Sequence, residues 1–109
     1  MKTLDKKDRI LINTLKNILR ANYGSIIISI HCYGSRITRG NKDSDFDILI
    51  LTEKQLNWKE QRKIKNAVYE YGIENDLVFD PKIFSNDEFE NKLSFLPFVQ
   101  NIKAIGIVV

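Results

Sequence analysis

The 109-residue sequence predicts an α+β fold in which a small mixed β-sheet is flanked by helices. Two short runs rich in β-branched residues, 25–33 and 45–52, are typical of buried strands. Apolar residues recur at helical spacing before these runs, in 5–21, and after them, in 57–71. A third strand is predicted over 76–84, so helices and strands do not alternate strictly as they would in an α/β protein.

The first predicted helix, 5–21, has one apolar and one polar face. Asn22, Tyr23 and Gly24 provide its stop, because glycine readily closes a helix. The apolar face consists of Leu4, Leu11, Ile12, Leu15, Ile18 and Leu19.

The run that follows lies between Gly24 and Gly34, and its side chains alternate between two sheet faces. Cys32 shares its face with Ile26, Ile28 and Ile30 and is predicted to be a core residue. His31 lies on the other face with Tyr33, where a partly covered sheet residue is favoured over a metal ligand.

In the second half, Gly72 is predicted to end the helix over 57–71, whose buried side would include Trp58, Ile64, Val68 and Tyr71. Pro81 lacks an amide hydrogen, which indicates an edge position or a bulge for the third strand. A short helix over 86–93 is expected next. After Pro97, a last helical turn should lead into an apolar terminal strand. That terminal strand either completes the sheet or meets a partner.

Composition narrows the classes of protein to consider. An apolar fraction of 43% and a charged fraction of 28% are ordinary for a globular protein, so we expect one domain over 1–109. A single cysteine excludes an internal disulfide, and the sequence shows neither a signal peptide nor an apolar run of the roughly 20 residues that a membrane span needs. These features predict a cytoplasmic protein. The net charge of +3, without basic residues clustered among aromatics, argues against direct nucleic-acid binding.

Two acidic residues open the second strand. Asp45 and Asp47 are separated by one residue, so they project from the same face, roughly 7 Å apart. Two carboxylates on one face repel each other unless cations compensate them. They therefore need either basic partners or Mg²⁺, which favours a few carboxylate oxygens completed by water and phosphate.

Gly34 and Ser35 follow directly on the first strand. A glycine at this position lets the backbone approach a ligand closely, and the amides and hydroxyl after it can hold phosphate oxygens. Arg36 and Arg39 lie near enough in sequence to neutralise a triphosphate. Taken alone, glycine and serine after a strand also fit an ordinary turn.

At these residues the sequence resembles the nucleotidyltransferase superfamily that includes DNA polymerase beta, and most closely its minimal nucleotidyltransferases. The family motif is Gly-Ser, a loop with a second glycine, then Ser-Asp-x-Asp before an apolar strand. The loop between Ser35 and Asp45 holds nine residues, about one fewer than the commonest form. The matching residues are Gly34, Ser35, Gly40, Ser44, Asp45 and Asp47.

The resemblance implies the polymerase beta-like palm fold and a site with a third carboxylate on a later strand. Asp76, followed by Leu77 and Val78, matches that pattern, and Asp80 is the alternative. Asp45, Asp47 and Asp76 would then be catalytic and would hold two Mg²⁺ ions. The expected nucleotide-binding residues are Gly34, Ser35, Arg36, Arg39 and Ser44.

The implied reaction is transfer of a nucleoside monophosphate, AMP from ATP, to an acceptor hydroxyl. Small family members often act as antitoxins beside a helical HEPN toxin, and some place AMP on a tyrosine of that partner. The resemblance thus implies ATP or another nucleoside triphosphate as substrate, a helical HEPN-type protein as partner, and a homo- or hetero-oligomer. The competing interpretation is a catalytically silent module of the same fold that neutralises or scaffolds a partner.

Overall fold

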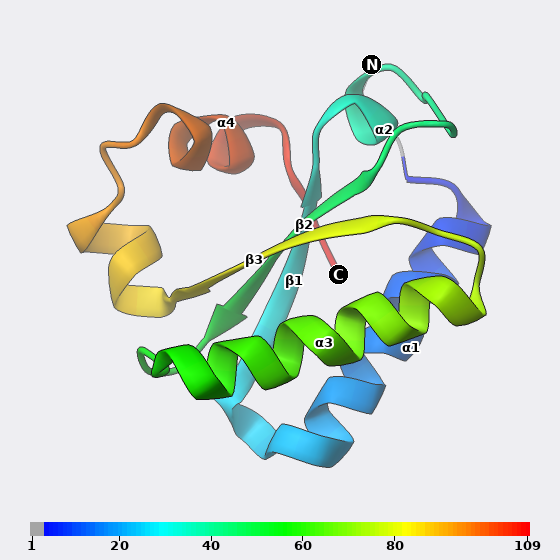
Figure 1. The fold of residues 1–109 in the computed structure, drawn as a ribbon. Helices are drawn as coiled ribbons and strands as arrows, with labels where there is room; N and C mark the ends of the chain where they lie inside the picture. The colour runs from blue at the N-terminus through cyan, green and yellow to red at the C-terminus, as the bar shows by residue number, and fades with distance from the viewer. Residues whose placement is uncertain (1–3) are drawn as a thin grey trace.

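A computed structural model describes residues 4–109 (Figure 1). It contains four helices, four strands and two short helical turns, η1 and η2. In chain order the elements are α1 (Lys6–Tyr23), η1 (Gly24–Ile26), β1 (Ile27–Tyr33), α2 (Ser35–Thr38), β2 (Phe46–Thr52), α3 (Trp58–Glu74), β3 (Phe79–Ser85), η2 (Glu88–Lys92), α4 (Pro97–Ile105) and β4 (Ile107–Val108).

The four strands form one mixed sheet in the order β3-β2-β1-β4. β1 runs antiparallel to β2 and to β4, whereas β2 and β3 are parallel. Parallel neighbours need a crossover, which α3 provides between β2 and β3 (Figure 1). This arrangement confirms the predicted α+β class and mixed sheet, and the edge position of β3 confirms the interpretation of Pro81.

Each face of the sheet is covered differently. α1 and α3 lie on one face and α4 lies on the other (Figure 1). The larger core, on the α1 and α3 side, includes Cys32, Ile48 and Ile50. The smaller core, under α4 and η2, includes Tyr33 and Leu49. Cys32 is thus the core residue that its parity predicted. His31 is half-buried on the other face, where its ring lies tilted against that of Phe89 with the two centroids 5.1 Å apart.

α1 begins where Asp5 caps it, with the Asp5 carboxylate accepting from the Asp8 amide at 2.8 Å. Ile12, Leu15 and Leu19 are fully buried, as its apolar face predicts. Ile18 differs, with 38% of its surface exposed.

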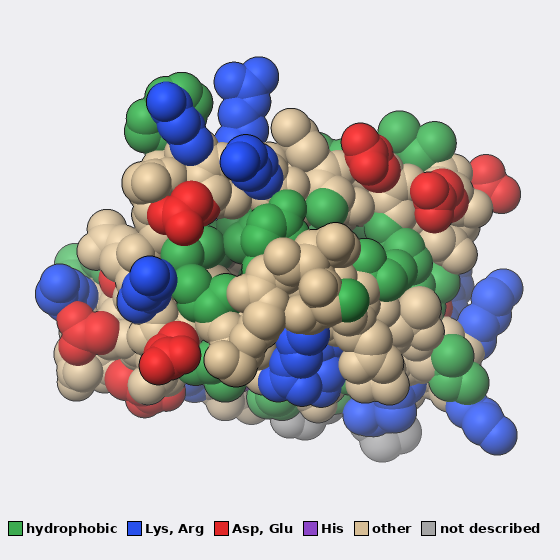
Figure 2. Space-filling view, turned by 90° about the horizontal axis from the view of Figure 1, so that it is seen from below, with side chains coloured by type: hydrophobic (Ala, Val, Ile, Leu, Met, Phe, Trp, Pro, Cys, Tyr) green, Lys and Arg blue, Asp and Glu red, His purple; other side chains and the backbone are tan. Residues whose placement is uncertain are grey.

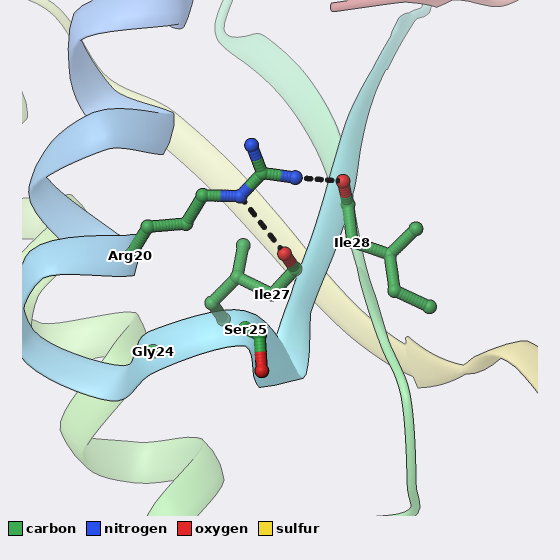
Figure 3. Close-up of a pocket in the computed structure, with 5 residues that line it drawn as sticks. All are labelled: Arg20, Gly24, Ser25, Ile27 and Ile28. Atoms are coloured by element: carbon green, nitrogen blue, oxygen red, sulfur yellow. Dashed lines mark hydrogen bonds between the residues drawn. The ribbon is translucent and has the colours of Figure 1, made fainter.

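The C-terminal end of α1 is fastened to the start of β1 by Arg20 (Figure 3). Its Nε donates to the Ile27 carbonyl at 3.0 Å and its Nη2 donates to the Ile28 carbonyl at 2.6 Å. Arg20 and the two isoleucines line a surface hollow of about 570 Å³ together with Gly24 and Ser25. Because the guanidinium already binds two carbonyls, we interpret this hollow as a structural junction.

α3 has a capping box in which the Asn57 side chain and the Glu60 side chain bond each other's backbone amides. Its buried residues include Ile64, Val68 and Tyr71, as predicted. Trp58 was expected beside them, but 67% of its surface is exposed. The prediction was wrong because Trp58 lies roughly 110° around the helix from that buried stripe.

The helix also continues past Gly72 to Glu74, so the predicted stop at Gly72 was wrong. Gly72 instead serves packing, since a Cβ there would lie 2.6 Å from the Leu77 carbonyl oxygen. The extra turn delays the third strand, which begins at Phe79 rather than at residue 76.

Charged side chains of both signs are mixed on the underside of the molecule, with hydrophobic side chains between them (Figure 2). None of the helices within residues 4–109 is long and apolar enough to cross a membrane.

Candidate functional site

The turn from β1 into α2 is built around Gly34. Its φ of 84° lies in the left-handed region that favours glycine. A Cβ at Gly34 would lie 2.1 Å from Oδ2 of Asp47. The glycine therefore lets the backbone turn and also lets the Asp47 carboxylate lie directly against it.

After Gly34 the chain forms the single helical turn α2. The amides of Ile37 and Thr38 both donate to the Gly34 carbonyl at 3.0 Å, and the Thr38 hydroxyl donates to it at 3.1 Å. The amides that precede them at the start of the turn have no carbonyl one helical turn earlier to accept from them. Such amides, next to a close-packed glycine, are the groups that hold phosphate oxygens in other proteins.

Ser35 and Ser44 connect the two halves of the sequence motif. Their hydroxyl oxygens lie 2.8 Å apart, which closes the loop between α2 and β2. The Ser35 amide nitrogen and both hydroxyls thus lie at the same end of the sheet as Asp47. The structure brings Gly34, Ser35 and Ser44 together as the motif predicts. The Ser35 hydroxyl, however, already donates its hydrogen bond to the Ser44 hydroxyl.

Asp47 and Asp80 are the paired carboxylates of the site. They are register partners on the parallel strands β2 and β3, so their side chains stand side by side on the α4 face. Burial raises the pKa of Asp47, and the negative charges of Asp80 and Asp45 raise it further. Asp45 is exposed and lies just before β2, at the end of the sheet that carries Asp47.

Asp76 is not beside this pair, contrary to the expectation that it shares a strand with Asp80. It lies in the turn between α3 and β3, where its φ of 56° makes it the left-handed residue that follows the helix. Aspartate tolerates this conformation better than most residues. Because α3 runs one turn further than predicted, the strand begins after Asp76, and Asp80 occupies the position next to Asp47.

Arg36 is also placed differently from the prediction. Its side chain is 6% exposed and makes an ion pair with Asp8 of α1 at 3.4 Å. Its Nη1 donates to the Lys42 carbonyl at 2.9 Å, and its guanidinium stacks 4.7 Å from the centre of the Phe46 ring. With these partners Arg36 holds the loop in place and is not free to neutralise a triphosphate. Arg39, in contrast, is exposed at the end of α2.

Two further residues of the site were missed in the sequence. Lys82 follows Asp80 by two positions on β3, and its Nζ lies 3.7 Å from Asp80 Oδ2. The hydroxyl of Tyr33, the register partner of Asp47 on β1, is fully enclosed and has no hydrogen-bond partner in the structure. The strand period of two that placed Asp45 with Asp47 also places Lys82 on the same face as Asp80, so Lys82 could have been found from the sequence. For Tyr33 the sequence indicated only the face of the strand on which it lies.

The carboxylates of Asp47 and Asp80 provide ligands for one divalent cation more readily than for two. Over residues 4–109 no three Asp, Glu, His or Cys side chains lie close enough together to hold a metal ion. Mg²⁺, however, is usually held by one or two carboxylates with water and phosphate oxygens as its remaining ligands. Burial is the first cause of the raised pKa of Asp47 and repulsion from Asp80 adds to it, and such a cation would relieve that repulsion. The donor set therefore fits one ion at this pair.

Comparison with known proteins agrees with the fold and the motif. The sequence model of the polymerase beta nucleotidyltransferase family matches residues 13–93. The chain therefore belongs to the polymerase beta nucleotidyltransferase family.

Among solved structures, the fold is similar to that of a chain in the crystal structure of a mutant of the MntA–HpeT toxin–antitoxin complex. The TM-score is 0.54 at 19% identity, and the match covers 98% of this chain and 72% of that one. This likeness confirms the predicted fold. A comparison with curated protein sequences gave no match.

Proposed function

We propose that this protein is a Mg²⁺-dependent nucleotidyltransferase that transfers AMP from ATP to an acceptor hydroxyl. The observation that carries the proposal is the pairing of Asp47 with Asp80 against the Gly34 turn. A carboxylate pair and a glycine turn with free backbone amides at one end of a sheet suit a nucleoside triphosphate and its cation. Membership of the polymerase beta family supports the same reaction class.

Each residue of the site has a definite task in this proposal. The amides at the start of α2, with the hydroxyls of Ser35 and Ser44, would hold phosphate oxygens. Asp47 and Asp80 would hold Mg²⁺, which when bound draws charge from the phosphates and lowers the pKa of the acceptor hydroxyl. A second ion would need Asp45 and the phosphates themselves. Arg39 supplies an exposed positive charge at the end of α2.

The proposed acceptor is a tyrosine of a helical, HEPN-type toxin, so that the protein would act as an antitoxin in a hetero-oligomer. The support is the similarity in fold to a chain of the MntA–HpeT toxin–antitoxin complex. AMP on a tyrosine adds a bulky anion to the partner, which can block a site by charge and by size.

The test is label transfer from ATP radiolabelled at the α-phosphate, with Mg²⁺ and the protein encoded by the adjacent gene. We expect the wild-type protein to label the partner. Asp47→Asn and Asp80→Asn should each reduce the rate of labelling by about a hundredfold or more. Asp76→Asn is the matched control, because Asp76 lies in the turn outside the site. Full labelling by Asp47→Asn would refute the proposal. Loss of labelling in Asp76→Asn but not in Asp80→Asn would restore the original assignment of the third carboxylate.

A second candidate is the silent binding module. It is favoured by one observation, that no group of three potential metal ligands forms within the described part of the chain. In that case neither the wild-type protein nor any variant would transfer label. Asp47→Asn and Asp80→Asn would bind the partner as tightly as wild type in calorimetry. Binding and transfer measured on the same variants therefore separate the two functions.

A further inference from the structure

Lys82 places an ammonium group beside the paired carboxylates. Its Nζ lies 3.7 Å from Asp80 Oδ2, and the two side chains are 39% and 52% exposed. Among the charges that act on Asp47, Lys82 opposes the rise in pKa that burial and Asp80 cause. The lysine is thus already a counter-ion of the pair, in the position where a cation would be attracted.

Tyr33 lies on the other side of the same pair and contains an unexplained polar group. Its hydroxyl is enclosed and makes no hydrogen bond of ordinary length, with Lys82 as the side chain that acts on it, although buried hydroxyls are nearly always fully bonded. Burial raises the pKa of this hydroxyl, whereas the charge of Lys82 and a side-chain hydrogen-bond interaction from Lys82 oppose the rise, so the ammonium already acts on Tyr33 as well as on the acids. An enclosed acceptor oxygen therefore lies next to a flexible lysine side chain.

We propose that Lys82 is a resident counter-ion that a divalent cation displaces from Asp47 and Asp80, and that the Tyr33 hydroxyl accepts a hydrogen bond from the displaced ammonium. An ammonium and a divalent cation beside the same carboxylates repel each other and compete for the same oxygens, so binding of the divalent cation favours departure of the ammonium. The lysine can do so by rotation of its side chain, because its stem is long and partly exposed. The inference rests on the proposed function in taking this pair as the cation site.

Displacement has a consequence for selectivity. A free cation must compete with Lys82 for the carboxylates, whereas a cation that arrives with a triphosphate brings oxygens that also attract the ammonium. Lys82 thus disfavours loading of the cation alone and favours loading of cation and nucleotide together.

The test is Mn²⁺ binding to the full chain without nucleotide, measured by electron paramagnetic resonance of the free ion. We expect Lys82→Met to bind Mn²⁺ about fivefold more tightly than wild type, because the competing charge is gone. Lys82→Arg keeps the charge and should bind within twofold of wild type. Lys54→Met, which removes an exposed lysine beyond the opposite end of β2, controls for net charge.

Tyr33→Phe tests the second half of the proposal. Removing the hydroxyl should weaken Mn²⁺ binding about twofold in the wild-type background. It should have no effect in Lys82→Met, because that variant has no ammonium group to which the Tyr33 hydroxyl could bond. A purely structural role for Tyr33 would give the same change in both backgrounds and would overturn the assignment of Tyr33.

Equal or weaker Mn²⁺ binding by Lys82→Met, or no binding by any variant, would overturn the displacement of Lys82. The label-transfer assay judges the proposed function separately, because it includes nucleotide. Thermal unfolding of each variant shows that the comparison is made between folded proteins.

Discussion

Asp47 shows at the scale of one residue how a charged site opposes stability. Burial and the charge of Asp80 raise its pKa above the ordinary value of 3.8. An acid whose pKa is raised in the folded state binds its proton more tightly there than in the unfolded chain. Stability is therefore lost as pH rises from the unfolded pKa through the folded one, and at neutral pH the full loss is present.

Asp47→Asn should accordingly raise the free energy of unfolding at pH 7, by at most about 1 kcal/mol because the group is partly solvated and its charge is screened. Below the ordinary carboxyl pKa both proteins carry a neutral side chain here, and the difference should disappear. Urea unfolding at pH 7 and pH 3 measures both. Asp76→Asn is the control, and a less stable Asp47→Asn at pH 7 would contradict the expectation.

Asp47 was identified directly from the sequence, whereas the partner of Asp47 was left open between Asp76 and Asp80. The apolar run after Asp47 fixes the strand, and the period of two fixes the face, so Asp47 needed only local information. The choice between Asp76 and Asp80 depended on where β3 starts and on its register with β2. Both are decided by contacts between α3 and the segment that follows it, which local patterns do not contain.

Among the elements, the turn between β1 and α2 joins the backbone to the carboxylates. Its glycine was predicted from position alone, and the structure adds the reason: at Gly34 the left-handed φ and the approach of Asp47 coincide. Gly24 ends α1 with a similar φ of 75°, yet nothing lies within 4 Å of a Cβ built there. The two glycines therefore differ in contact and not in backbone strain.

This pair allows a controlled prediction. Gly24→Ala should cost about 2 kcal/mol, for backbone strain alone, because a φ of 75° with a ψ of −158° is a conformation that glycine alone adopts readily. Gly34→Ala should cost about 3 kcal/mol, because Asp47 must also move. It should also lower AMP transfer by more than its loss of folded protein explains. Chemical denaturation and label transfer give the two readouts.

The excess cost should shrink when the colliding carboxylate is removed. In an Asp47→Ala background, Gly34→Ala should approach the cost of Gly24→Ala, because Oδ2 and Cγ are gone. An unchanged difference between the two glycines would place the strain of Gly34 somewhere other than its contact with Asp47.

Across the whole molecule, the loop of the site is anchored to the first helix by buried charge. Arg36 was predicted to bind phosphate because it follows Gly34 and Ser35, and the structure pairs it instead with Asp8, 28 positions earlier. The sequence showed Asp8 only as one of several charges at the start of a helix. A pair this distant becomes visible only when α1 packs beside the loop, which explains why its role was not predictable.

Asp8 also binds Lys42 of the same loop, with Nζ 2.9 Å from Oδ2. The Asp8 and Arg36 side chains are 8% and 6% exposed, so solvent replaces little of what either loses. Asp8→Asn should therefore cost about 3 kcal/mol, chiefly because Arg36 keeps its charge in a buried place without a full partner. Amide exchange at Ser44, whose amide donates within the loop to Asn41, should become faster.

Asp5→Asn provides the matched control. Asp5 also contacts Lys42, but its side chain is 50% exposed, and asparagine caps a helix as well as aspartate does. Its cost should stay below about 0.5 kcal/mol. Replacing the buried pair together, as Asp8→Leu with Arg36→Met, should recover most of the stability lost in Asp8→Asn, since no charge is then left unpaired. If the double variant were as unstable as Asp8→Asn, the loss would come from packing between α1 and the loop, and the ion pair would not be the anchor.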